Sequence, residues 1–232
     1  MKNTKKQIFA AALLIVISAI SSCKKEANLG GDIAFVAVYN AIPSATALNF
    51  LIDNRVVNGS TPLIFGANTA YTGVYQGTYT AQTVIANSST ALAPTQVSFE
   101  GKISRSLFLT GTTTAVNYFW IMDDLGVVDT ERAKVRFLNM SPDAGALVLE
   151  LQLLGTKTTF TDRSNQQYTD YISFTPGTEY TINLLDRATN TSVATTIRAT
   201  FAKGKLYTIW AKGLTGSTVD AEKLSIQLSV QN

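Results

Sequence analysis

The sequence predicts an all-β protein made of two tandem Ig-like, Greek-key β-sandwich domains behind a lipoprotein signal peptide. Two observations indicate the fold. A segment at 36–52, VAVYNAIPSATALNFLI, returns in altered form at 135–151 as VRFLNMSPDAGALVLEL. Short runs rich in Val, Ile, Thr, Tyr and Phe recur between clusters of Asn, Gly, Pro, Asp and Ser, and no stretch sustains a helical apolar period over three turns.

Residues 1–22 have the pattern of a signal peptide. Three lysines precede an apolar run of 13 residues at 8–20, which is shorter than the roughly 20 residues of a membrane-spanning helix. The sequence Ile20-Ser21-Ser22-Cys23 resembles a lipobox, so we expect lipidation at Cys23, the only cysteine in the chain. The alternative is an ordinary signal peptide that contains a cysteine.

Residues 23–32 are polar, contain Gly30-Gly31, and are expected to form a lipidated tether. Acyl chains contribute about 0.8 kcal/mol per buried CH₂, so several of them would anchor the protein stably in a membrane. Lys24 differs from the Asp that retains many lipoproteins at an inner membrane, so the resemblance favours the outer membrane. The periplasmic or surface face is left open.

The net charge argues against nucleic acid as a partner. Cleavage removes three of the 19 basic residues and leaves 16, equal to the 16 acidic residues. A neutral chain offers no general attraction to phosphates.

The β-sandwich domains are expected at 33–125 and 133–232, with Asp53-Asn54 as a hairpin turn. Alternation at 181–184 and 225–230 predicts apolar side chains facing the interior and polar ones facing water. The strands of the first domain are expected at 33–39, 48–52, 63–65, 71–74, 78–85, 95–100, 106–110 and 118–122, and those of the second at 134–139, 147–153, 157–160, 168–174, 180–185, 192–201, 206–212 and 224–230.

The string VRFLNMSPDA at 135–144 and the later GKLYTI at 204–209 resemble the domain of unknown function 4397 family. The motifs lie mainly within 133–230, and residues 33–122 form a weaker copy in which Ile42-Pro43-Ser44 replaces Ser-Pro-Asp. Tandem copies behind a lipoprotein signal are similar to Bacteroidetes members. The resemblance implies a β-sandwich and an envelope location, and no established activity.

Composition excludes several enzyme classes. The chain has no histidine, which removes Ser-His-Asp triads, HExxH metalloproteases and ordinary zinc sites. Glu100 and Glu150 could form a glycosidase pair, but solvated strand faces are the simpler interpretation. We therefore expect no catalytic residues and no cofactor.

Three groups of residues are candidate binding sites, each with a structural alternative. Asn139, Ser141 and Asp143 could line a ligand site or form a turn. Tyr118 and Trp120 share one strand face and could stack on a ligand, or belong to the core. The acidic residues near the domain junction could bind Ca²⁺ or form a solvated linker; they are Asp123, Asp124, Asp129 and Glu131.

The sequence therefore predicts a lipid-anchored envelope protein of non-enzymatic binding, adhesion or structural type. Its partners would be a membrane, through the lipid, and a glycan or another envelope protein. The alternative is a carbohydrate-active accessory protein at the outer membrane, either glycan-binding or a weak hydrolase. A third hypothesis is a subunit of a surface assembly.

Overall fold

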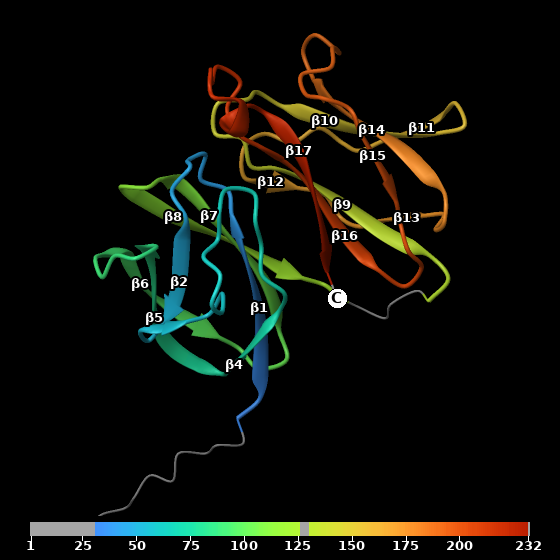
Figure 1. Ribbon diagram of the computed structural model, residues 1–232. Coiled ribbons are helices and arrows are strands. Elements are labelled where there is room, and N and C mark those ends of the chain that lie inside the picture. The colour runs from blue at the N-terminus through green and yellow to red at the C-terminus, as the bar shows by residue number, and fades with distance from the viewer. Residues whose placement is uncertain (1–30, 126–129, 232) are drawn as a thin grey trace, which may run out of the picture. The chain divides into compact units, whose positions relative to one another are not determined.

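The computed structural model describes residues 31–125 and 130–231, shown in Figure 1. The predicted signal peptide, Cys23 and most of the tether lie outside these residues. Within the described part, the only helix assigned is the short 3-10 helix η1 (Asp220–Glu222). No described helix is long and apolar enough to span a membrane. Residues from Asp32 onward form one compact unit.

Two four-stranded sheets form the first sandwich. One has the order β4-β1-β7-β8 and the other β3-β2-β5-β6. The strand β1 pairs in parallel with β7, and the other neighbours are antiparallel. The strands are β1 (Ile33–Asn40), β2 (Leu48–Ile52), β3 (Arg55–Val56), β4 (Thr72–Tyr75), β5 (Gly77–Ile85), β6 (Ala91–Phe99), β7 (Ser104–Thr112) and β8 (Ala115–Asp123).

The second sandwich repeats this strand order, as Figure 1 shows. Its sheets run β12-β9-β16-β17, with β13 also on β9, and β11-β10-β14-β15. The strands are β9 (Ala133–Asn139), β10 (Leu147–Leu153), β11 (Thr156–Thr159), β12 (Gln167–Tyr168), β13 (Ile172–Phe174), β14 (Glu179–Asp186), β15 (Ile197–Thr200), β16 (Leu206–Lys212) and β17 (Ser225–Gln231). The predicted all-β sandwich architecture is confirmed.

Several predicted strands differ in detail. The segment 63–65 makes only an isolated bridge, between Leu63 and Leu48. The segment 168–174 is split into β12 and β13, and 192–201 is reduced to β15. The turn at Asp53-Asn54 is confirmed, because both residues have left-handed φ angles, 45° and 63°.

Each sandwich has its own apolar core between its two sheets. In the first, Val36 of β1 and Leu107 of β7 meet Phe50 of β2. In the second, Phe137 of β9 and Ile209 of β16 meet residues of β10 and β14. These buried side chains alternate along their strands, as a half-buried sheet face requires.

A third apolar cluster joins the outer faces of the two sandwiches. Tyr39 and Phe108 of the first sandwich stack with their ring centroids 4.4 Å apart. Trp210 of the second sandwich meets Phe108 edge to face at 5.5 Å. Both faces of β1, β9 and β16 are therefore covered, which explains their nearly continuous burial.

The last strand, β17, departs from the expected alternation. Ser229 was expected to face water but is 3% exposed, and Val230 was expected to face the interior but is 45% exposed. Gln231, on the same face as Ser229, is 4% exposed. The prediction was wrong at this strand because the polar face of β17 packs against the first sandwich. Ser229 accepts a hydrogen bond from the Trp210 indole at 3.3 Å and donates one to Asn68 at 2.9 Å.

A buried ion pair lies in the same interface. Arg136 Nη1 of β9 is 2.7 Å from Asp123 Oδ1 of β8, and the two side chains are 3% and 0% exposed. The two atoms are close enough for an ion pair, but their geometry is not that of a hydrogen bond, so Oδ1 accepts none. The other oxygen, Oδ2, accepts hydrogen bonds from Tyr71 at 2.7 Å and Ser106 at 2.8 Å. Because removing either charge would leave the other buried, we expect the loss of one partner to destabilise the contact between the sandwiches.

Gln231, the last residue of β17, connects this pair to its surroundings. Its amide nitrogen donates to Tyr39 at 3.3 Å, to Tyr71 at 3.2 Å and to Ser106 at 3.2 Å. Its amide oxygen accepts from Tyr171. The polar network therefore spans both sandwiches and satisfies groups that burial would otherwise penalise.

The buried tyrosines of the interface predict a sensitivity of the folded state to alkaline pH. Burial raises the pKa of Tyr171 to about 12, although the Arg136 charge opposes this. Burial also raises the pKa of Tyr39 and of Tyr71. A phenol whose pKa is higher in the folded state keeps its proton there while the unfolded chain loses it, so stability falls as pH rises from about 10 toward 12.

We expect Tyr171→Phe to reduce this alkaline loss. Its free energy of unfolding should fall less between pH 9 and pH 12 than that of the wild type, whatever its value at pH 8. Guanidinium titrations across this range measure the slope, with Tyr168→Phe at an exposed position as the control. A wild-type slope in Tyr171→Phe would contradict the assignment.

Candidate functional site

The predicted ligand residue Asn139 has a structural role that its counterpart Asn40 shares. Both are fully buried. Asn139 donates to the carbonyls of Arg163 at 3.0 Å and Gly145 at 3.1 Å, and its oxygen accepts from the Ser141 amide at 3.0 Å. Asn40 makes the matching bonds to the Leu63 carbonyl and the Ile42 amide. Each Asn holds the corner at which the chain passes from one sheet to the other.

Ser141 and Asp143 tie this corner to the loop after β16. Ser141 Oγ donates to the Gly213 carbonyl at 2.6 Å. Asp143 accepts from the Thr215 amide at 2.9 Å and from its hydroxyl at 2.8 Å. Partial burial by itself raises the pKa of Asp143, but the hydrogen bonds from Thr215, Gly216 and Ser141 lower it below the usual value. The contacts favour the turn interpretation of this motif.

We expect Asn139→Ala to cost about 2–3 kcal/mol, since it leaves buried donors and acceptors unsatisfied. Asp143→Ala should cost less than about 1 kcal/mol, because its exposed carboxylate is easily replaced by water. Urea denaturation of both variants tests this. Equal losses of unfolding free energy in the two variants would contradict the distinction between the buried Asn139 and the exposed Asp143.

The other predicted groups lie in different places. Tyr118 and Trp120 are half-buried and pack on the first core, against Phe50 and Phe99 with ring centroids 5.9 Å apart in each case. Phe119 takes the opposite face, toward the interface cluster. They lie at the rim of a core and form no open stacking platform together.

The three predicted calcium ligands within the described residues do not cluster. Asp123 is buried against Arg136, which differs from the solvated linker that the sequence suggested. Glu131 is 3.8 Å from Lys203, Asp124 is exposed, and Asp129 lies outside the described residues. Among the described residues no three metal-type side chains cluster. A calcium site that includes Asp129 stays a prediction.

The two glutamates considered for glycosidase chemistry belong to different sandwiches. Glu100 is 3.5 Å from Arg105, and Glu150 is 3.0 Å from Lys157. Glu150 also accepts a hydrogen bond from Asn183 at 3.2 Å. Each carboxylate has a basic partner within its own sandwich.

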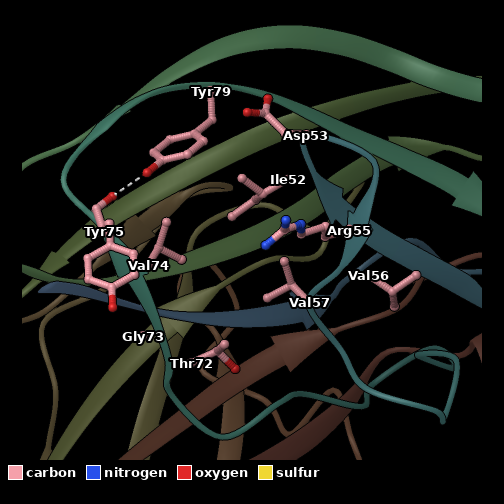
Figure 2. A pocket seen from close by; sticks show the side chains of 10 residues that line it. All are labelled: Ile52, Asp53, Arg55, Val56, Val57, Thr72, Gly73, Val74, Tyr75 and Tyr79. Atoms are coloured by element: carbon pink, nitrogen blue, oxygen red, sulfur yellow. Dashed lines mark hydrogen bonds between the residues drawn. The ribbon is translucent and has the colours of Figure 1, made fainter. Parts of the chain in front are cut away.

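An open groove lies at one edge of the first sandwich, between the β2–β3 hairpin and β4, and is shown in Figure 2. Its volume is about 590 Å³. Val57 and Val74 point into it from opposite walls, and Tyr79 closes one end by donating to the Tyr75 carbonyl at 2.9 Å. The lining residues are Ile52, Asp53, Arg55, Val56, Val57, Thr72, Gly73, Val74, Tyr75 and Tyr79.

The second sandwich has the same groove in a filled form. Val74 faces Ala34 in the strand register, and Phe174 faces Ala133 at the equivalent place. Val57 donates its amide to the Phe50 carbonyl, and Phe160 donates to Leu149 in the same way. Two valines of the first groove thus correspond to two phenylalanines, Phe160 and Phe174, which stack with ring centroids 5.9 Å apart.

The remaining volume reflects this replacement. The groove of the second sandwich holds about 350 Å³, compared with about 590 Å³ in the first. Tyr180, the counterpart of Tyr79, donates to the Thr175 carbonyl at 3.3 Å but is only 5% exposed. Phe174 meets Tyr180 edge to face at 5.5 Å. The chain therefore occupies part of this groove itself and leaves a smaller one.

Charge also distinguishes the two grooves. Figure 2 shows the Arg55 guanidinium pointing into the first groove, between Ile52 and Val57. Arg55 has no ion-pair partner among the described residues. Asp53 uses its carboxylate to accept the Thr80 amide at 2.8 Å. In the first sandwich Arg55 pairs with Ile52, and in the second Thr158 pairs with Leu151 at the same register position. Thr158 is therefore the equivalent of Arg55.

Sequence reasoning missed the groove because the two hairpins differ in length. Pro142 follows Pro43 by 99 residues, whereas Phe160 follows Val57 by 103. A fixed alignment of the repeat therefore pairs the wrong residues at this point. Only the strand register matches valine with phenylalanine.

A family model described as "Domain of unknown function (DUF4397)" matches residues 34–150, just over half of the chain. The match runs from β1 into β10. It covers the first sandwich and the start of the second, whereas the motifs noted in the sequence lie mainly in the second copy. No curated protein matches the chain.

Solved structures of bacterial proteins show weak similarity to the chain. One is CBMbc of family CBM26 from Eubacterium rectale Amy13K in complex with maltoheptaose, at 9% identity and TM-score 0.26, covering 85% of this chain and 95% of the other. Another is a Bacteroides fragilis protein with a suspected role in cell adhesion, at 11% identity and TM-score 0.25, covering 82% and 84%. Such scores carry no functional argument for this chain.

Proposed function

Given that the chain belongs to the DUF4397 family, whose description names no activity, we propose that it is a lipid-anchored protein of the bacterial outer membrane that binds a partner without transforming it. The observation that carries the proposal is the wide first groove, whose counterpart in the second sandwich is narrowed by Phe160 and Phe174. Replacing Phe with Val in a packed site normally costs stability, because apolar contacts are lost. An apolar hollow with an inward-pointing Arg55 is better explained as a site for a ligand.

The non-enzymatic part of the proposal rests on the side chains. Histidine is absent from the sequence, and the carboxylates of Asp123 and Glu150 are held by basic neighbours. The carboxylate of Asp53, at the groove, accepts a hydrogen bond from the Thr80 amide. General acid-base work needs a titratable group near a reacting atom. Of the two phenols that line the groove, the Tyr79 hydroxyl donates to the Tyr75 carbonyl, and Tyr75 is exposed.

The envelope location rests on the sequence at Cys23 and the tether that follows. We expect wild-type protein to fractionate with outer membranes and Cys23→Ala to be released in soluble form. Mass spectrometry of the mature N-terminus would show the acyl chains directly. An unmodified N-terminus in a membrane-free fraction would overturn the anchor.

The groove is tested with soluble residues 24–232 and outer-membrane preparations from the source cells. The double variant Val57→Phe/Val74→Phe copies the filled groove and should bind at least tenfold less. Thr158→Phe adds bulk at the second groove and serves as the matched control, with binding within twofold of wild type. Undiminished binding by the double variant would show that the groove is not the binding site.

A glycan is the second candidate ligand, because the Tyr75 ring is 52% exposed at the groove and could stack on a sugar. A glycan array probed with the same variants tests this candidate. Binding that is lost on filling the groove would favour the carbohydrate-binding alternative.

A further inference from the structure

We propose that the groove of the first sandwich takes an extended peptide segment of a partner protein, which adds as a strand to the free edge of β4 and inserts an aromatic side chain between Val57 and Val74. This inference rests on the proposed binding function and specifies its ligand. It is carried by the backbone of β4, by the contents of the second groove and by Arg55.

The outer edge of β4 leaves both backbone groups of Gly73 and the amide of Tyr75 available for pairing. The Gln76 amide donates to the Asp32 carbonyl at 2.9 Å, which sets the alternation of the β1–β4 ladder. Residues at the intervening positions, Gly73 and Tyr75, then direct their amides and carbonyls away from β1. The Tyr75 carbonyl accepts from Tyr79, while Gly73 has no hydrogen-bond partner within the described part of the chain. An edge of this kind is a template for strand addition.

The second sandwich shows how the equivalent edge is closed. Ser173 has the register position of Gly73, since it faces Lys134 where Gly73 faces Phe35. Its carbonyl accepts from Arg132 Nη2 at 3.4 Å. The second sandwich therefore caps its own edge with a side-chain donor. No side-chain donor to the Gly73 carbonyl is present among the described residues of the first sandwich, so this carbonyl is open to solvent or to an added strand.

The same comparison identifies the side chain that the first groove lacks. Phe160 and Phe174 fill the second groove with two stacked rings. Their counterparts, Val57 and Val74, are smaller and line a groove of about 590 Å³ between the equivalent strands. A phenyl ring on an added strand would restore the packing that the second sandwich makes internally.

Arg55 adds a preference for charge. Its guanidinium points into an apolar groove in which Asp53 is engaged by Thr80. An acidic side chain two residues from the aromatic one would lie on the same face of an added strand and reach the same groove. A charge-assisted hydrogen bond to guanidinium is among the stronger polar contacts. The proposed ligand is thus an extended segment with an aromatic and an acidic residue at alternate positions.

The test uses residues 24–232 and blocked seven-residue peptides of sequence TVTFTDT, with binding followed by fluorescence anisotropy. Two further versions carry N-methyl groups on either the odd or the even residues. Because alternate amides of an added strand face the edge, only one of these two versions should lose binding. Val74→Phe should weaken binding at least tenfold, and Thr158→Phe should leave it within twofold.

Charge exchange supplies a variant that does not alter the packing. Arg55→Glu should weaken TVTFTDT about tenfold and bind TVTFTKT better than wild type does, since Arg55 is exposed and its replacement leaves the core untouched. Equal effects of the two N-methylation patterns, or wild-type affinity of Val74→Phe, would overturn the strand-addition proposal.

The two proposals fail in different ways. If outer-membrane binding is lost on filling the groove but a glucan heptasaccharide binds in place of the peptides, the binding function stands and the peptide ligand is overturned. If outer-membrane binding survives the filled groove, the proposed function itself fails. Loss of peptide binding in Val74→Phe with a wild-type melting temperature supports both.

Discussion

Arg136→Met should lower the free energy of unfolding by about 3–5 kcal/mol, because it leaves the Asp123 carboxylate buried without its charge partner. The carboxylate is 0% exposed and keeps only the hydrogen bonds from Tyr71 and Ser106. The guanidinium also donates to Thr208 at 3.0 Å and would leave that hydroxyl without this contact. Guanidinium denaturation at pH 7 measures the loss.

Two controls separate the ion pair from general damage. The double variant Asp123→Leu/Arg136→Met should recover much of the loss, since removing both charges relieves the buried one. Lys102→Met breaks the exposed pair with Asp32, whose side chains are 79% and 50% exposed, and should cost less than about 1 kcal/mol. A loss below about 1 kcal/mol in Arg136→Met would show that the pair does not hold the interface.

Trp210→Ala should also cost about 3–5 kcal/mol, the range for large aromatic residues truncated in a core. The indole is fully buried, meets Tyr39 and Phe108 edge to face, and donates to Ser229. It lies between the sandwiches and outside both of their own cores. We therefore expect the sandwiches to lose cooperativity, with two resolved transitions in calorimetry in place of one.

The comparison for this prediction is Ile182→Ala, inside the second core. It should cost about 2–5 kcal/mol without separating the transitions. A single transition in Trp210→Ala at an unchanged midpoint would contradict a stabilising role for the interface cluster.

Local pattern made many strands predictable, because their apolar residues recur toward the core of their own sandwich. The bounds of β2, β10 and β16 coincide with those predicted, and the turn at Asp53-Asn54 follows from residues that tolerate left-handed angles. The repeat around Pro43 and Pro142 likewise indicated the doubled architecture.

The contacts between the sandwiches could not be predicted from the sequence. Ser229 and Gln231 look like the solvent face of a strand, and only the docking of a second sheet buries them. Asp123 looked like part of a charged linker for the same reason, since its partner Arg136 lies on another sandwich.

The candidate groove could not be predicted from the sequence for a different reason. The stacking of Phe160 on Phe174 and the gap between Val57 and Val74 depend on strand register, which a longer second hairpin displaces in the sequence. Asn139 and Asp143 attracted functional hypotheses because polar residues near Pro resemble a site. Their hydrogen bonds go to backbone groups at the corner between two strands.

The central claim is that the first groove is open to a partner, whereas the chain itself narrows the second with Phe160 and Phe174. The most direct measurement places the photo-crosslinking residue p-benzoyl-phenylalanine at position 75 or, as the matched position, at 175, in cells that make the full-length protein. We expect a discrete adduct from Tyr75, its loss when Val57→Phe/Val74→Phe is added, and none from Thr175. Equal adducts from both positions, or an adduct from Tyr75 that survives the filled groove, would contradict the account.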